Sequence, residues 1–116
     1  MHKVCEDLQV TGVNIERVMS RFMGNEMMYI NFLKRFTEDK SFEKMQNSFR
    51  QGDLEEAFKA AHTLKGLIAN LGLDGIMEAV NPITEILRVG SDEGIKELME
   101  QAGKEYEMVL EILATI

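Results

Sequence analysis

His62 and Lys65 are the two side chains whose types and spacing favour phosphoryl chemistry. Histidine has a reference pKa of about 6.5, so at neutral pH its ring offers an uncharged nitrogen that can attack an electrophilic phosphorus. Residues three apart on a helix are neighbours, and Lys65 therefore places a positive charge beside this ring. Such a cation stabilises the charge that spreads over the phosphoryl oxygens during transfer. The pair predicts a histidine that accepts a phosphoryl group.

Gly66 and Ala69 are small residues that follow His62 on nearly the same side of a helix. Glycine inside a helix costs roughly 1 kcal/mol relative to alanine, so its position one turn after the histidine needs a reason. Without a Cβ at Gly66, and with only a methyl at Ala69, another protein can bring its surface close to the imidazole. We expect a docking surface formed by Phe58, Lys59, Gly66 and Ala69, although Lys59 alone is interpreted as a solubilising surface lysine.

The segment that must carry these residues is predicted to be one helix over Asp53–Leu71, about 28 Å long. Asp53 and Glu56 resemble a capping box at its start, and Gly72 is a typical helix terminator. At about 100° per residue, one face of this helix is apolar and His62 lies outside it. The residues of that predicted core face are Leu54, Ala57, Ala61, Leu64, Ile68 and Leu71.

Helical periodicity extends over most of the remaining chain. It predicts a short helix over Asn14–Met23, a pattern from Asn25 to Gln51 that continues or breaks briefly at Asp39–Ser41, a helix over Asp74–Val89, and a long last helix from Ile95 to Leu113. Pro82 should bend the third of these near Asn81, because proline lacks a backbone donor and clashes with the preceding turn. Gly103 is a weak point of the last helix.

The connections between these segments are short, which favours antiparallel neighbours. The predicted fold is therefore all-α: an up-down antiparallel four-helix bundle with a short additional N-terminal helix. Residues 1–11 show little periodicity and are interpreted as a loose lead-in, and residues 12–116 as the bundle domain. The nine methionines are assigned to the core by default, with a role of Met27 and Met28 beside Phe58 in docking left as an alternative.

Charge and composition exclude several functions for these 116 residues. A formal charge of −7 would repel nucleic acid. Cys5 has no partner for a disulfide or a zinc site, and no segment has the length and apolarity of a membrane span. Glu6 and Asp7 stand where a signal peptide would need its apolar core. We therefore expect a cytoplasmic protein without metal or nucleic-acid binding.

The run Ala61-His62-Thr63-Leu64-Lys65-Gly66, followed by Leu71-Gly72-Leu73, resembles the histidine-containing phosphotransfer (HPt) domain of bacterial phosphorelays. A weaker resemblance covers Arg21-Phe22, Gly24-Asn25 and Tyr29–Phe36, and together the match runs from about residue 14 to the end. Two features depart from the family pattern: Asn81-Pro82 interrupts a segment that is usually an unbroken helix, and Leu67 replaces a residue that is often small.

The resemblance implies that His62 is the phosphorylation site, that Lys65 stabilises the phosphoryl group and that Gly66 provides clearance. It also implies a partner, the receiver domain of a response regulator or hybrid histidine kinase, whose aspartate exchanges the group. Magnesium would be supplied by that receiver, because the helix of His62 offers no carboxylate pair suited to it. The chain itself needs no cofactor.

Two other functions compete with a phosphoryl carrier. One is a helical adaptor that binds a receiver or another signalling partner without being phosphorylated. The other is a fragment of a dimeric histidine kinase, which would need a bundle formed across a dimer and an adjoining ATP-binding domain. The chain has no Gly-rich phosphate loop, so we expect a carrier and not an enzyme with its own ATP site. One histidine patch on a self-contained bundle needs no second copy, and we expect a monomer.

Overall fold

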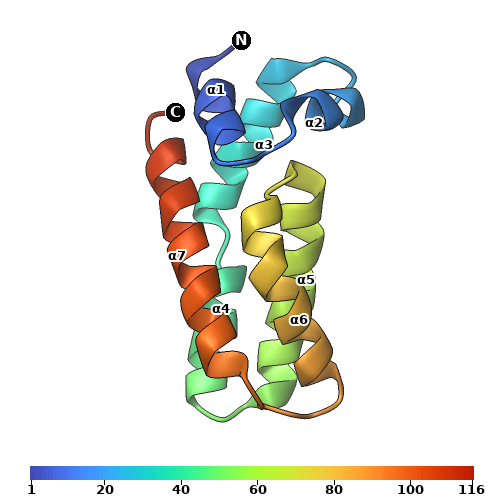
Figure 1. The fold of residues 1–116 in the computed structure, drawn as a ribbon, viewed down its shortest axis with the longest axis vertical. Coiled ribbons are helices and arrows are strands. Elements are labelled where there is room, and N and C mark those ends of the chain that lie inside the picture. The colour runs from blue at the N-terminus through green and yellow to red at the C-terminus, as the bar shows by residue number, and fades with distance from the viewer.

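The computed structural model describes residues 1–116, which form seven α-helices and no strand (Figure 1). The order is α1 (Lys3–Val10), α2 (Ile15–Arg21), α3 (Glu26–Glu38), α4 (Ser41–Arg50), α5 (Leu54–Leu71), α6 (Asp74–Arg88) and α7 (Ile95–Leu113). The prediction of an all-α fold is confirmed. None of these helices combines the length and apolarity needed to cross a membrane.

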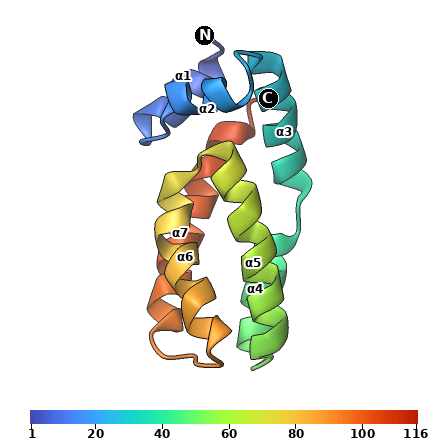
Figure 2. The same ribbon diagram turned by 90° about the vertical axis from the view of Figure 1, so that its right-hand side faces the viewer.

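Four helices run alternately down and up the long axis and form the bundle (Figures 1 and 2). α5 packs between α4 and α6, and α7 packs against α6. Tyr106 of α7 closes the bundle on the other side, because its ring stacks on Phe42 of α4 at 4.1 Å between centroids. The molecule is accordingly elongated, with extents of 43 × 23 × 21 Å. The up-down antiparallel topology was predicted from the short connections.

α3 continues α4 upward after a break at Asp39 and Lys40 (Figure 2). Asp39 adopts an extended conformation, with φ −70° and ψ 140°. Its carboxylate accepts a hydrogen bond from the backbone N–H of Ser41 at 2.8 Å, which satisfies one free donor at the start of α4. Of the two alternatives that the sequence left open for this region, the structure shows the break.

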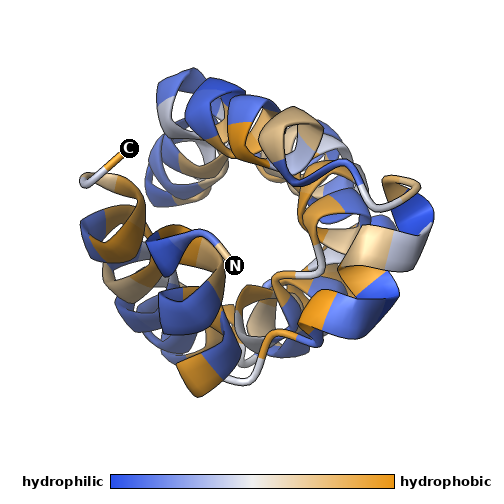
Figure 3. Cartoon of the chain, turned by 90° about the horizontal axis from the view of Figure 1, so that it is seen from above, coloured by the Kyte–Doolittle hydropathy of each residue, from blue (hydrophilic) through white to orange (hydrophobic).

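A single apolar core joins all seven helices. Viewed from above, the helices surround a common centre (Figure 3). α5 buries Ala57, Ala60, Ala61, Leu64, Ile68 and Leu71, so its predicted core face is confirmed except that Leu54 is only half-buried and Ala60 is added. α6 remains helical through Pro82, and α7 through Gly103. The bend that Pro82 should cause stays a prediction.

The interpretation of residues 1–11 as a loose lead-in is wrong, because Lys3–Val10 form α1 across the top of the bundle (Figure 1). The side chain of His2 caps this helix by accepting a hydrogen bond from the backbone N–H of Val4 at 3.1 Å. Val4, Cys5 and Leu8 share one face and are fully buried. Two turns of helix give too few apolar positions for the periodicity to stand out in the sequence.

Candidate functional site

His62 lies on α5, and the two ends of this helix explain its position. At the start, the carboxylate of Asp53 accepts a hydrogen bond from the backbone N–H of Glu56 at 3.1 Å. At the end, Gly72 adopts a left-handed conformation with φ 71° and stops the helix. The apolar face between them is held in the core, and His62, which lies off that face, is exposed to solvent.

The ring of Phe58 stacks near that of His62, at 6.0 Å between centroids and with 25° between the planes. Phe58 is half-buried, so it joins the apolar core to the exposed histidine. The guanidinium carbon of Arg88 from α6 lies 5.1 Å from the centroid of the Phe58 ring, a cation–π contact. The ring of Phe58 therefore contacts both His62 on its own helix and Arg88 on α6.

Lys65, the predicted stabilising cation, reaches across to α6. Its Nζ lies 3.8 Å from Oε1 of Glu85, and one third of its side chain is exposed. Oε2 of Glu85 lies 3.3 Å from Nε of Arg88. Neither Glu85 nor Arg88 is recognisable from the sequence as part of this site, because nothing in one sequence fixes the register of α6 against α5. Their spacing as an acid–base pair three residues apart was the only local signal.

Gly66 and Ala69 are both exposed on α5. A Cβ built at Gly66 would have no atom within 4 Å, so the space beside it is open to solvent. Further along, Nη1 of Arg21 donates hydrogen bonds to the carbonyl oxygens of Ala69 and Asn70, at 2.5 and 2.7 Å. This contact ties α2 to the last turn of α5, where backbone carbonyls lack helical partners.

Lys59 is exposed and already paired within its own helix. Its Nζ lies 3.3 Å from a carboxylate oxygen of Glu56 and 3.7 Å from one of Glu55. The hydrogen bond to Glu56, followed by the negative charge of both glutamates, raises the pKa of Lys59. The structure thus places this predicted docking residue near His62, but with its charge balanced by neighbours.

Apolar side chains of α3 extend the exposed surface toward the top of the molecule. Met27 and Met28 are 58% and 38% exposed, so the default assignment of methionines to the core is wrong for these two, as it is for the exposed Met1 and Met23. Phe32, which is 36% exposed, lines a hollow of about 280 Å³ between α3 and α5 together with Leu67. His62 is not among the residues that line this hollow.

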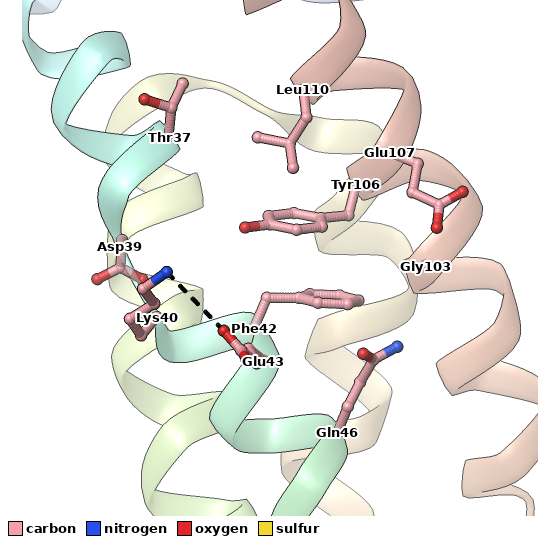
Figure 4. Close-up of a pocket in the computed structure, with 10 residues that line it drawn as sticks. All are labelled: Thr37, Asp39, Lys40, Phe42, Glu43, Gln46, Gly103, Tyr106, Glu107 and Leu110. Atoms are coloured by element: carbon pink, nitrogen blue, oxygen red, sulfur yellow. Dashed lines mark ion pairs between the residues drawn. The ribbon is translucent and has the colours of Figure 1, made fainter.

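A larger hollow, of about 360 Å³, lies on a different side of the bundle (Figure 4). Its lining comes from the end of α3, from α4 and from α7, with no residue of α5 or α6. Phe42 and Tyr106 stack within it, and Lys40 pairs with Glu43 at 4.0 Å (Figure 4). The volume of a hollow therefore does not indicate where the candidate site of this molecule lies. No group of three or more potential metal-ligating side chains gathers anywhere in the structure.

The structure is an up-down helical bundle with an exposed histidine beside a lysine on one of its inner helices in sequence, α5. The chain matches the model of the Hpt domain over residues 28–114 and belongs to this family. Membership implies a histidine phosphotransfer role in a phosphorelay, as a carrier, and Hpt domains generally interact with receiver domains. No curated protein and no solved structure shows a significant match to the chain.

Proposed function

We propose that this protein is a phosphorelay intermediate that carries a phosphoryl group on His62 and exchanges it with the aspartate of a receiver domain. The observation that carries the proposal is the exposure of His62 on α5 next to the open space at Gly66. A receiver must bring its aspartyl phosphate to within bonding distance of the ring, and only an unobstructed histidine permits this approach. Family membership over residues 28–114 supports the same role.

The transfer is a substitution at phosphorus. The lone pair of one neutral ring nitrogen of His62 forms the N–P bond while the P–O bond to the receiver's aspartate breaks. The aspartate leaves as a carboxylate with the electron pair, and the second ring nitrogen keeps its proton. Onward transfer to another receiver reverses these changes, so the carrier itself ends unaltered.

Lys65 is the chain's own group for stabilising the phosphoryl oxygens, since it is the i+3 neighbour of His62 on α5. The receiver supplies magnesium together with its aspartate, and the carrier supplies position and charge. Phe58, Gly66 and Ala69 form the apolar part of the docking surface, with Lys59 at its edge. We place the protein in the cytoplasm, as is typical of Hpt domains, and as a monomer.

The direct test is phosphoryl transfer from a receiver domain labelled with radioactive acetyl phosphate in the presence of magnesium. Wild-type protein should acquire acid-labile label, and His62→Gln should acquire none. His2→Gln is the matched control, because His2 caps α1 and lies outside the docking surface. Binding of the receiver without any labelling of wild type would favour the adaptor function, and labelling of the His62→Gln protein would contradict the assignment.

A further inference from the structure

The register of α5 against α6 places two α6 side chains level with His62. Phe58 meets Arg88, and Lys65 meets Glu85. His62 lies between these two contact points along α5, four residues after the first and three before the second. At about 100° per residue it is within about 60° of both around the helix axis. Glu85 and Arg88 therefore lie on the border between α6 and the turn of α5 that carries His62.

One carboxylate is shared between two cations at this border. Glu85 pairs with Lys65 at 3.8 Å through Oε1 and with Arg88 at 3.3 Å through Oε2. Apart from these two partners, the salt bridges of α5 join Lys59 to Glu55 and Glu56, and Glu56 also to Lys44 of α4. Glu85 is thus the one negative group placed to compete with a phosphoryl on His62 for the nearby charge of Lys65.

We propose that Glu85 is a positioning residue that holds Lys65 in the unphosphorylated protein and yields it to the phosphoryl group, so that its charge sets how readily His62 accepts and releases that group. This inference rests on the proposed phosphorylation of His62 and deepens it. A carrier must not retain its phosphoryl group too firmly, and a fixed carboxylate beside the site raises the free energy of the phosphorylated state. Arg88, which also contacts the Phe58 ring, is the second cation beside Glu85.

The geometry suits an exchange of partners. The side chains of Lys65 and Glu85 are 33% and 53% exposed, and ion pairs of such exposure contribute little to stability. A phosphoryl group carries more negative charge than one carboxylate, so it can draw the lysine away from Glu85 without loss of fold. A buried pair could not be separated in this way.

Phosphoramidate provides a test that needs no partner protein. The lone pair of a His62 ring nitrogen forms the new N–P bond, the P–N bond of phosphoramidate breaks, and its protonated nitrogen leaves as ammonia. Removing one negative charge beside the site should speed this labelling about fivefold at low salt. Intact mass spectrometry measures the rate for wild type, Glu85→Gln, Glu85→Asp and Glu78→Gln.

Glu78 is the matched control, because it lies two turns before Glu85 on the same face of α6, is exposed, and makes no ion pair. We expect faster labelling of Glu85→Gln only, a gain that shrinks at high salt, and rates for Glu85→Asp and Glu78→Gln close to wild type. Circular dichroism checks that each variant keeps its helices.

The other outcomes distinguish a failure of the proposed phosphorylation of His62 from a failure of the proposed role of Glu85. If wild type is not labelled at all, the phosphoacceptor function fails and this inference falls with it. If wild type is labelled but Glu85→Gln reacts at the same rate or more slowly, the role of Glu85 alone is overturned. In a Lys65→Ala background the gain from Glu85→Gln should diminish; an undiminished gain would overturn the assignment of Glu85 as the counter-ion of that lysine.

Discussion

The ring of Phe58 lies 6.0 Å from the ring of His62, one turn earlier on α5, and it is the only aromatic ring paired with the histidine. It also receives the guanidinium of Arg88 from α6. Phe58 therefore links the exposed histidine of α5 to a cation of α6.

Replacement of Phe58 by alanine tests this link. Because Phe58 is half-buried against the core, we expect the free energy of unfolding to fall by about 1–2 kcal/mol, less than for a fully buried ring. The affinity for a receiver domain should fall as well, since the docking surface loses its largest apolar group. Urea unfolding and isothermal titration calorimetry measure the two effects. Phe58→Leu is the control, which keeps much of the apolar area; equal binding by all three proteins would contradict a docking role.

Two substitutions of Gly66 test its effect on stability and its effect on function separately. No atom lies within 4 Å of a Cβ built there, so Gly66→Ala should raise the free energy of unfolding by about 0.5–1 kcal/mol. Gly66→Glu should also fold, yet block transfer from a receiver by filling the approach to His62 and repelling the phosphoryl group. Normal transfer by folded Gly66→Glu would contradict the clearance argument.

Gly72 is the matched control for Gly66 on the same helix. Its φ is +71°, and a Cβ there would stand 2.5 Å from Cγ2 of Val18. Gly72→Ala should therefore destabilise the protein by about 1–3 kcal/mol. Thermal unfolding of the two alanine variants compares them directly.

The sequence predicts most of the site because the site lies on one helix. His62, Lys65 and Gly66 are related by spacings of three and four, which a helix turns into neighbours without any tertiary contact. Glu85 and Arg88 were missed because they reach the site only through the register of α6 against α5, which depends on how the side chains of both helices interlock. The break at Asp39 was left open for a related reason, since the apolar pattern continues across it.

α1 was missed as an element, and its contribution to stability can be measured. Leu8 is fully buried, so Leu8→Ala should lower the free energy of unfolding by about 2–4 kcal/mol. Val10 on the same helix is 88% exposed, and Val10→Ala should change it by less than about 0.5 kcal/mol. Equal urea midpoints for the two variants would show that α1 does not pack on the bundle in solution.

Alkaline pH should destabilise the fold through Cys5. Burial, followed by its contact with Glu26, raises the pKa of the Cys5 thiol to about 11 from an ordinary value of 9.0. The folded protein then binds more protons than the unfolded chain between these values, so stability is fully present below pH 9 and is lost as the pH rises through 11. Urea unfolding at pH 8 and pH 10.5 measures the loss. Cys5→Ala should lessen this dependence but not remove it, because burial also raises the pKa of the Tyr29 hydroxyl.

The isolated protein should not label itself from ATP. Its sequence has no Gly-rich phosphate loop, and in the proposed function a receiver brings both the aspartate and the magnesium. We therefore expect no incorporation when the pure protein is incubated with labelled ATP, and incorporation from a labelled receiver only while magnesium is present. Chelation of magnesium during the second reaction should stop transfer, and restoring magnesium should allow transfer to resume. Incorporation from ATP alone would instead identify a kinase, and transfer that continues in chelator would place the stabilising charge entirely on Lys65 and its neighbours.

Added salt tests the apolar character of the docking surface. Because this surface is mainly apolar, salt should reduce transfer only modestly.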